Sequence, residues 1–394
     1  MKIILKTFFA LFIVAFTGCD SLIDNKPAVS ERNVTFRIKL VDSTGVLKKV
    51  YGNSAVKKAE VILKSNALGT VYNLVSDDQG FVTLSNAISD KYVISAVRLL
   101  TPLEVEKGIG NKSVQEHKLV NFNAGIIELR ADYHKVVEVC LDKVLVQSPL
   151  VISEIYACGP PKAGLYFHDK YIEIFNNSDE VQYLDSLLVM QVYANVSLGF
   201  SYVNDSSFVH SKNIWMFPGT GRDYPIKPGQ FVVAAGDAID HRINAPYSVD
   251  LSKVSFEFYK KDAPDIDNKN IPNMIMFYQS AGNDWLIGGE SDALVIARVG
   301  STNDIIWEND HYKVPMKYVL DGAEYLSDPT RLDKKKLYPG IDASATGGIT
   351  FYTGKTMERL TVRKNGRLYL KDSNNSSLDF KVYSQPSPEY HNEN

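Results

Sequence analysis

Few residues in this sequence have the types and spacing that catalysis or metal binding requires. The seven histidines form no HxH or HxxxH pair, and such close pairs commonly bring two imidazoles onto one metal ion. Three histidines have an aspartate as their immediate sequence neighbour, at His168-Asp169, Asp240-His241 and Asp310-His311. No GxSxG nucleophile motif and no GxGxxG dinucleotide fingerprint is present. The sequence therefore predicts no catalytic residues, no metal site, no cofactor and no enzyme activity.

Two glutamates, Glu154 and Glu173, stand within apolar, strand-like segments. A pair of carboxylates can act as general acid and general base. Each of these glutamates alternates with apolar neighbours, so the pattern favours a structural role. We expect both side chains to face solvent or to meet a partner at the rim of a sheet.

The first of the three cysteines, Cys19, follows a segment with the features of an export signal. Lys2 and Lys6 precede the apolar run Thr7–Phe16, and Thr17-Gly18 supplies small residues before the cysteine. A membrane-spanning helix needs about 20 apolar residues, and this run is too short to provide one. The pattern predicts a signal peptide over residues 1–18 and a polar tether over residues 19–32.

The cysteine directly after Thr-Gly makes this segment similar to a bacterial lipobox, although Phe16 stands where an aliphatic residue is usual. The resemblance implies cleavage before Cys19 and acylation of its thiol. Several acyl chains would hold the mature protein on a membrane. An ordinary signal peptide with an incidental cysteine is the alternative.

The other two cysteines, Cys140 and Cys158, flank the junction between the two predicted domains. The cell envelope is oxidising, and a disulfide across this separation would contribute about 3 kcal/mol in the loop-entropy model. Cys140 lies among apolar residues and is also compatible with a buried free thiol. The sequence leaves a disulfide and two free thiols as equal alternatives.

Length and composition indicate an ordinary globular protein of two domains. The chain has 394 residues, 43 Lys and Arg against 46 Asp and Glu, and 45% hydrophobic residues. The mildly acidic balance without a basic cluster argues against nucleic-acid binding and against electrostatic docking to anionic membranes.

The first domain, predicted over residues 33–147, has the two-residue period of β-strands. Val34, Phe36, Ile38 and Leu40 alternate with polar residues, which indicates a strand with one buried face. The successive segments AEVIL, DDQGFVTL and KYVISAV resemble a transthyretin-like or carboxypeptidase-regulatory-like β-sandwich. Such domains commonly serve as spacers.

The second domain, predicted over residues 148–384 and followed by a tail at 385–394, resembles an expanded lamin-tail domain, which is an immunoglobulin-like β-sandwich. Four segments carry the resemblance in the right order: VISEIY with YIEIFNNSDE, KPGQFVVA, DALVI, and finally MERL with DSNNSSLDF. The fold class that we predict is therefore all-β, with two sandwich domains, the second of which has long loop insertions.

The insertions, mainly within 196–224, 240–272 and 307–350, contain many aromatic residues. Long loops on a rigid scaffold are common binding sites, and aromatic rings give a large contact area at low entropic cost. The predicted ligand or partner contacts are Tyr202, Trp215, Phe217, Tyr224, Trp307 and Tyr312. The alternative is that the loops fold back and bury these rings.

As a whole, the chain resembles a family of Gram-negative lipoproteins that pair these two kinds of domain. Such lipoproteins commonly accompany TonB-dependent outer-membrane transporters. The resemblance implies a non-enzymatic, lipid-anchored ligand-binding or accessory subunit at the outer membrane, facing the cell exterior, with the periplasmic face as the alternative. An adhesin or structural envelope protein is the second hypothesis, and a hydrolase acting on polymers is the third.

Overall fold

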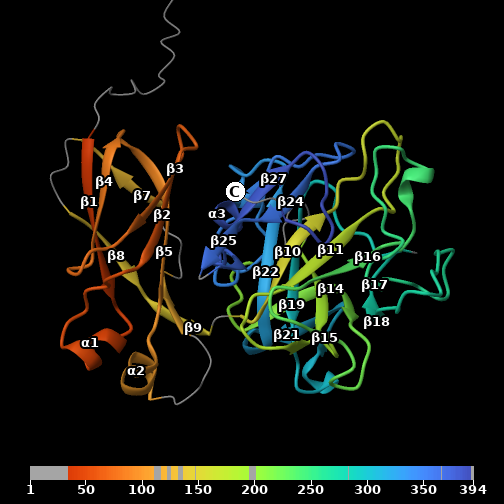
Figure 1. Ribbon diagram of the computed structural model, residues 1–394, viewed down its shortest axis with the longest axis horizontal. Helices are drawn as coiled ribbons and strands as arrows, with labels where there is room; N and C mark the ends of the chain where they lie inside the picture. The colour runs from red at the N-terminus through yellow and green to blue at the C-terminus, as the bar shows by residue number, and fades with distance from the viewer. Residues whose placement is uncertain are drawn as a thin grey trace, which may run out of the picture.

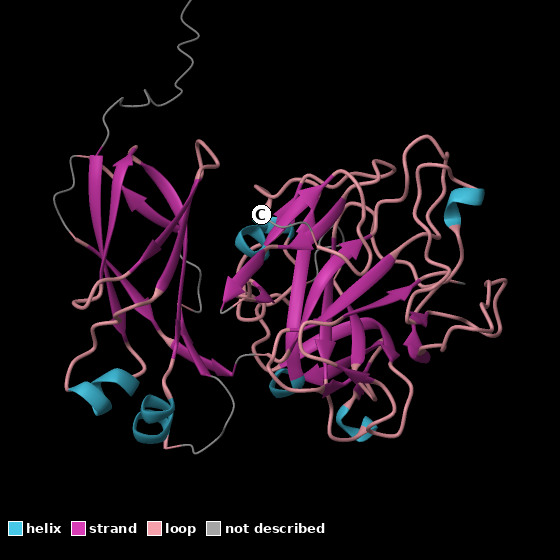
Figure 2. Ribbon diagram, viewed as in Figure 1, coloured by secondary structure: helices cyan, strands magenta, loops and turns pink. Residues whose placement is uncertain are grey.

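The structure is a computed structural model that describes residues 34–110, 117–121, 126–131, 136–146, 148–194, 201–282, 284–364 and 366–391. The protein is mostly β, with several sheets and few, short helices (Figure 2). Cys19, the predicted signal peptide and the tether lie outside the described residues. None of the helices within the described ranges has the length and hydropathy needed to span a membrane.

The N-terminal region, residues 34–146, forms two sheets that pack on a common core (Figure 1). One sheet has the order β4-β1-β8, and the other has the order β3-β2-β5-β6-β9, with β7 also paired to β5. The strands are β1 (Val34–Asp42), β2 (Glu60–Ser65), β3 (Val71–Val75), β4 (Phe81–Ala87), β5 (Asp90–Leu99), β6 (His117–Val120), β7 (Ile126–Leu129), β8 (Val137–Leu141) and β9 (Lys143–Val146). The helical elements are α1 (Val46–Tyr51), α2 (Pro102–Glu104) and the π-helical turn η1 (Val105–Ile109).

Strand β1 shows why this region folds as it does. Phe36, Ile38 and Leu40 are buried, whereas Thr35 and Arg37 between them are exposed. Because side chains alternate across a strand, the predicted two-residue pattern gives one apolar face that packs on the core.

The C-terminal region, residues 148–391, contains two larger sheets and two short ribbons. The first sheet has the order β17-β16-β11-β10-β24-β27, and the second has the order β20-β21-β14-β13-β19-β22-β23, with β18 also paired to β14. The strands of the two larger sheets are β10 (Leu150–Tyr156), β11 (Tyr171–Asn176), β13 (Leu188–Val192), β14 (Phe208–Met216), β16 (Phe231–Ala235), β17 (Phe256–Glu257), β18 (Ile275–Gln279), β19 (Asp292–Ala297), β20 (Ile306–Glu308), β21 (His311–Pro315), β22 (Val319–Leu326), β23 (Thr346–Gly347), β24 (Thr356–Arg359) and β27 (Phe380–Tyr383).

The ribbons are formed by the pairs β12 (Gln182–Tyr183) with β15 (Pro225–Ile226), and β25 (Thr361–Lys364) with β26 (Arg367–Leu370). The helical elements of this region are short: η3 (His241–Ile243), η4 (Thr302–Asp304), η5 (Met316–Tyr318), η6 (Leu332–Lys334) and α3 (Ser376–Asp379). The main core lies between the two large sheets and is rich in aromatic rings. Within it, the rings of Phe258 and Trp285 stack with their centroids 4.0 Å apart, and Trp215 contacts Phe258 edge to face.

Arg359, at the end of β24, organises a buried cluster of charges in the C-terminal region. Its guanidinium lies 2.6 Å from Asp321, 3.5 Å from Asp372 and 3.7 Å from Asp379. It also donates to the carbonyl of Ile152 on β10. The cluster therefore joins two central strands to the segment that precedes β27.

The two regions meet through a buried ion pair. Strands β1–β9 pair among themselves, and so do strands β10–β27. Between the regions, Lys118 on β6 donates to the carboxylate of Asp372 at 2.8 Å, and the Lys118 side chain is only 2% exposed. Lys64 makes a longer contact of 3.5 Å with the carbonyl of Ser377.

Glu154 and Glu173 do not face solvent: each meets partners, but on inner strands of the sheet and not at its rim. They are cross-strand partners on β10 and β11, and Glu358 on β24 is the partner of Glu154 on the other side. All three are buried, because the chain end that follows β27 lies over them and contacts their carboxylates.

Candidate metal centre

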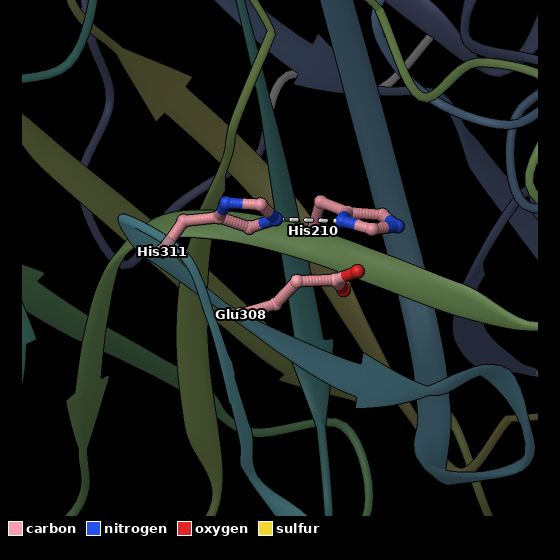
Figure 3. Close-up of side chains that lie close together, drawn as sticks. All are labelled: His210, Glu308 and His311. Atoms are coloured by element: carbon pink, nitrogen blue, oxygen red, sulfur yellow. Dashed lines mark hydrogen bonds between the residues drawn. The ribbon is translucent and has the colours of Figure 1, made fainter.

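The hairpin of β20 and β21 brings together two histidines and a glutamate. Asn309 adopts a positive φ of 58° in the turn of this hairpin, a conformation that asparagine tolerates well. The turn places Glu308 opposite His311, while β21 pairs with β14 so that His210 lies opposite Lys313. His210, Glu308 and His311 therefore lie on adjacent strands and close together (Figure 3).

The two imidazole rings contact each other directly. His210 Nδ1 lies 2.7 Å from His311 Nε2. One nitrogen of each ring and a carboxylate oxygen of Glu308 all lie within 4.8 Å of one another. Both histidines are buried and Glu308 is partly exposed, so this cluster has one side near solvent.

The outer nitrogen of each ring is bonded to a carboxylate. His210 Nε2 lies 2.8 Å from Asp205 Oδ2, and His311 Nδ1 lies 3.0 Å from Asp310 Oδ1. Metal-binding histidines commonly have such a carboxylate partner, which fixes the ring orientation and increases the basicity of the inner nitrogen.

The protonation of the cluster follows from these contacts. Burial would raise the pKa of Asp205, but hydrogen bonds from His210 and nearby amides outweigh it and lower that pKa. Hydrogen bonds from Tyr193 and His311 lower the pKa of Asp310. An ionised carboxylate accepts hydrogen bonds, so an N–H on each outer nitrogen fits these contacts and leaves the inner nitrogens of the two rings facing each other. Burial lowers the pKa of His210, which favours its neutral imidazole.

Aromatic rings surround the cluster. Tyr202 stacks on His210 with ring centroids 3.7 Å apart, and the Tyr193 hydroxyl donates to Asp310 at 2.6 Å. On the same hairpin, the ring of Trp307 contacts those of Tyr312 and Tyr278 edge to face. Trp307 is 51% exposed. Trp307 and Tyr312 form the rung next to that of Glu308 and His311, so their rings project from the opposite face of the sheet.

The structure divides the six predicted contact residues into two groups. Tyr202 stacks on His210 in the candidate metal centre, whereas Trp307 and Tyr312 contact each other on the other face of the same hairpin. For Trp215, Phe217 and Tyr224 the structure agrees with the alternative, in which the rings are buried. Trp215 and Phe217 lie in the core and Tyr224 packs against it, because β14 is a strand of the second large sheet and not a free loop.

The disulfide alternative for Cys140 and Cys158 is also wrong, because both thiols are free. Cys140 is exposed on β8. Cys158 is buried, with its sulfur 3.1 Å from the carbonyl oxygen of Lys355, so its thiol is partnered within the C-terminal region.

Sequence reasoning missed the histidine cluster because it considered only ligands close in sequence. His210 and His311 are 101 positions apart and meet only through the pairing of β14 with β21. A usable signal was present in Glu308-Asn309-Asp310-His311, where a carboxylate, a tight turn and an Asp-His pair occur together.

These features define a mostly β protein with a histidine–carboxylate cluster on one face of a sheet. Residues 227–387 match the family model described as "Protein of unknown function (DUF4876)", and this segment contains Glu308 and His311. No curated protein matches the chain.

Among solved structures, the chain resembles a DUF4876 family protein from Bacteroides thetaiotaomicron. The two share 24% sequence identity with a TM-score of 0.54, over 88% of this chain and 94% of that one. The similarity shows a shared fold. A weaker similarity is to the major pilin subunit of Bacillus cereus. It has 9% identity and a TM-score of 0.16, over 76% of this chain and 97% of the other.

Proposed function

We propose that the protein is a non-enzymatic, lipid-anchored binding protein of the cell envelope, whose ligand is a divalent transition metal held by His210, Glu308 and His311. The observation that carries the proposal is that each imidazole has a carboxylate on its outer nitrogen while the inner nitrogens converge. That arrangement orients two neutral donors toward one point.

The ligand types indicate which ions the centre would accept. Two imidazoles and one carboxylate suit Zn²⁺ and its neighbours in the first transition series, whereas Ca²⁺ prefers six to eight oxygen ligands. Three protein ligands would leave one position of a tetrahedral ion open. The partly exposed side at Glu308 would let that position face solvent or a partner.

The proposed setting in the cell comes from the resemblances in the sequence. They support an anchor on Cys19, a transthyretin-like spacer, a lamin-tail-like binding domain and a place beside a TonB-dependent outer-membrane transporter. An adhesin or structural envelope protein that uses the exposed Trp307 surface is the second candidate. A polymer hydrolase that uses the open metal position is the third.

We expect the full mature chain to bind Zn²⁺, and His311→Asn to weaken that binding by at least about 100-fold. Asp310→Asn should weaken it by about 10- to 100-fold, because the residue supports His311 without contacting the ion. Titration against a chromophoric chelator measures both affinities.

The control is Trp307→Ala, which alters the same hairpin without removing a ligand and should bind Zn²⁺ like the wild type. Equal affinity in His311→Asn and the wild type would contradict the metal site, and metal-dependent polymer turnover would favour the hydrolase.

We expect Cys19→Ser to move the protein from the membrane fraction to the soluble fraction, because acylation would have no thiol to act on. Antibody capture from envelopes dissolved in mild detergent should recover the wild type with a TonB-dependent transporter in comparable amount. Membrane retention of Cys19→Ser would exclude the lipid anchor. Capture without a stoichiometric transporter would favour the adhesin or structural candidate.

A further inference from the structure

A second cluster of ionisable groups lies inside the C-terminal region, away from the histidine pair. Glu173, Glu154 and Glu358 occupy one rung across the adjacent strands β11, β10 and β24. Cross-strand partners project from the same face of a sheet, so the three carboxylates are neighbours. All three are buried.

The end of the chain covers this rung. The amide of Ser387 donates to Glu154 at 3.2 Å, and the amide of Glu389 donates to Glu173 at 2.5 Å. The hydroxyl of Ser387 donates to Glu358 at 2.6 Å. His391, also buried, lies with Nε2 3.2 Å from Glu173 and Nδ1 3.9 Å from Glu358.

The polar groups of this cluster are incompletely satisfied. Glu154 Oε2 and His391 Nδ1 are buried and have no hydrogen-bond partner among the described residues. Buried polar atoms of this kind are rare in folded proteins and commonly mark a bound water or ion. Several adjacent carboxylates inside a protein are also costly unless they are protonated or paired with a cation.

Burial outweighs the hydrogen bonds that Ser387 and Glu389 donate to these carboxylates, so their charged forms stay disfavoured. Burial, together with the charge of Glu173, raises the pKa of Glu154 well above its usual range. Burial raises the pKa of Glu173 to about 8, and burial lowers the pKa of His391 to about 4. A neutral imidazole among carboxylates is the state in which histidine binds metals.

We propose that Glu154, Glu173 and His391 hold a divalent cation of the Zn²⁺ or Mn²⁺ class, with Glu358 beside it, and that this ion fixes the chain end onto the sheet. Their ligand atoms lie within 4.8 Å of one another. Carboxylates with one imidazole suit these ions. Because the cluster is closed to solvent, the ion would be structural, and the site is independent of the proposed function at His210 and His311.

The test is the metal content of the full mature chain after dialysis against Zn²⁺, Mn²⁺ or Ca²⁺ and removal of free ions. His391→Ala should lose about one equivalent of Zn²⁺ or Mn²⁺ per chain relative to the wild type. Tyr390→Ala, a change at an adjacent side chain that is 62% exposed, should keep it. His311→Asn should lose a different equivalent, so the two sites can fail separately. Equal metal content in His391→Ala and the wild type would overturn the proposal.

Hydrogen exchange gives a second measurement that does not depend on metal stoichiometry. Chelation of the wild type should accelerate exchange of the Ser387 and Glu389 amides by about 100-fold or more, because opening of the chain end would no longer require loss of the ion. Glu154→Gln mimics a protonated glutamate, so this variant shows whether an ion or a proton neutralises Glu154 in the wild type. If Glu154→Gln has the same metal content, stability and slow exchange as the wild type, Glu154 is not a ligand of an ion and the proposal is wrong.

Discussion

Replacing Arg359 with methionine is expected to lower the free energy of unfolding by about 3–5 kcal/mol, the cost typical of breaking a buried ion pair. The substitution keeps the volume of the aliphatic stem but leaves Asp321, Asp372 and Asp379 without their shared cation. Burial already raises the pKa of Asp321 to about 6 with Arg359 present, so these carboxylates are poorly solvated. Urea unfolding followed by circular dichroism measures the change.

The matched control is Arg331→Met, because Arg331 is an exposed arginine that also pairs with an aspartate, Asp333, at 2.8 Å. Exposed pairs contribute about 0–1 kcal/mol, so the two variants should differ severalfold. Comparable losses in both would mean that the buried cluster contributes little to stability.

Replacing Lys118 with methionine is expected to cost about 3 kcal/mol of unfolding free energy and to uncouple the melting of the two regions. Lys118 lies in the N-terminal region, and its partner Asp372 lies in the C-terminal region. Removing the lysine leaves a buried carboxylate at the contact between them. The calorimetric profile should therefore change from a single transition for the whole protein to two separate transitions, one for each region.

Lys64→Met is the control for the same contact, because the Lys64 side chain donates at 3.5 Å to the uncharged carbonyl of Ser377 and not to a carboxylate. It should leave the calorimetric profile nearly unchanged. A single transition in Lys118→Met, at an unchanged temperature, would mean that other contacts hold the regions together.

The coupling should also depend on pH. Burial alone would raise the pKa of Asp372, but Lys118 and Arg359 outweigh it and lower the pKa to about 2. A carboxylate with a folded-state pKa below its unfolded value of about 3.9 stabilises the fold above that value. The contribution is lost as the pH falls from about 4 to about 2, so the wild type should approach the behaviour of Lys118→Met over that interval.

The local patterns of the sequence predicted individual strands but not the clusters that form between them. The alternation around Ile38 predicted β1 and its buried face, and the closing motifs that contain Arg359 and Asp379 do lie together. Local pattern could not show that the segment after β27 returns over Glu154. It also could not show that Trp215 lies between two sheets, because both outcomes depend on pairings between strands far apart in sequence.

The pairing of His210 with His311 was hidden for the same reason. Each histidine is unremarkable within its own strand, and the chemistry arises from the register between β14 and β21. The sequence contains three Asp-His neighbours. Of the three, Asp310 and His311 do form a side-chain hydrogen bond, which makes this short signal more informative than spacing between histidines alone.

The pairing of β10 with β24 determines when the C-terminal region can be completed during biosynthesis. β10 begins this region, whereas Thr356 on β24, which bonds Glu154, lies 202 positions later. Contacts of such long sequence separation form slowly and only after both segments are available. A nascent chain could pair β10 with β11 and β16 early, but it would lack β24 and β27 on the other side of β10 until residues 356–383 had been synthesised. Chains that stop before residue 356 would therefore leave that edge of β10 unpaired.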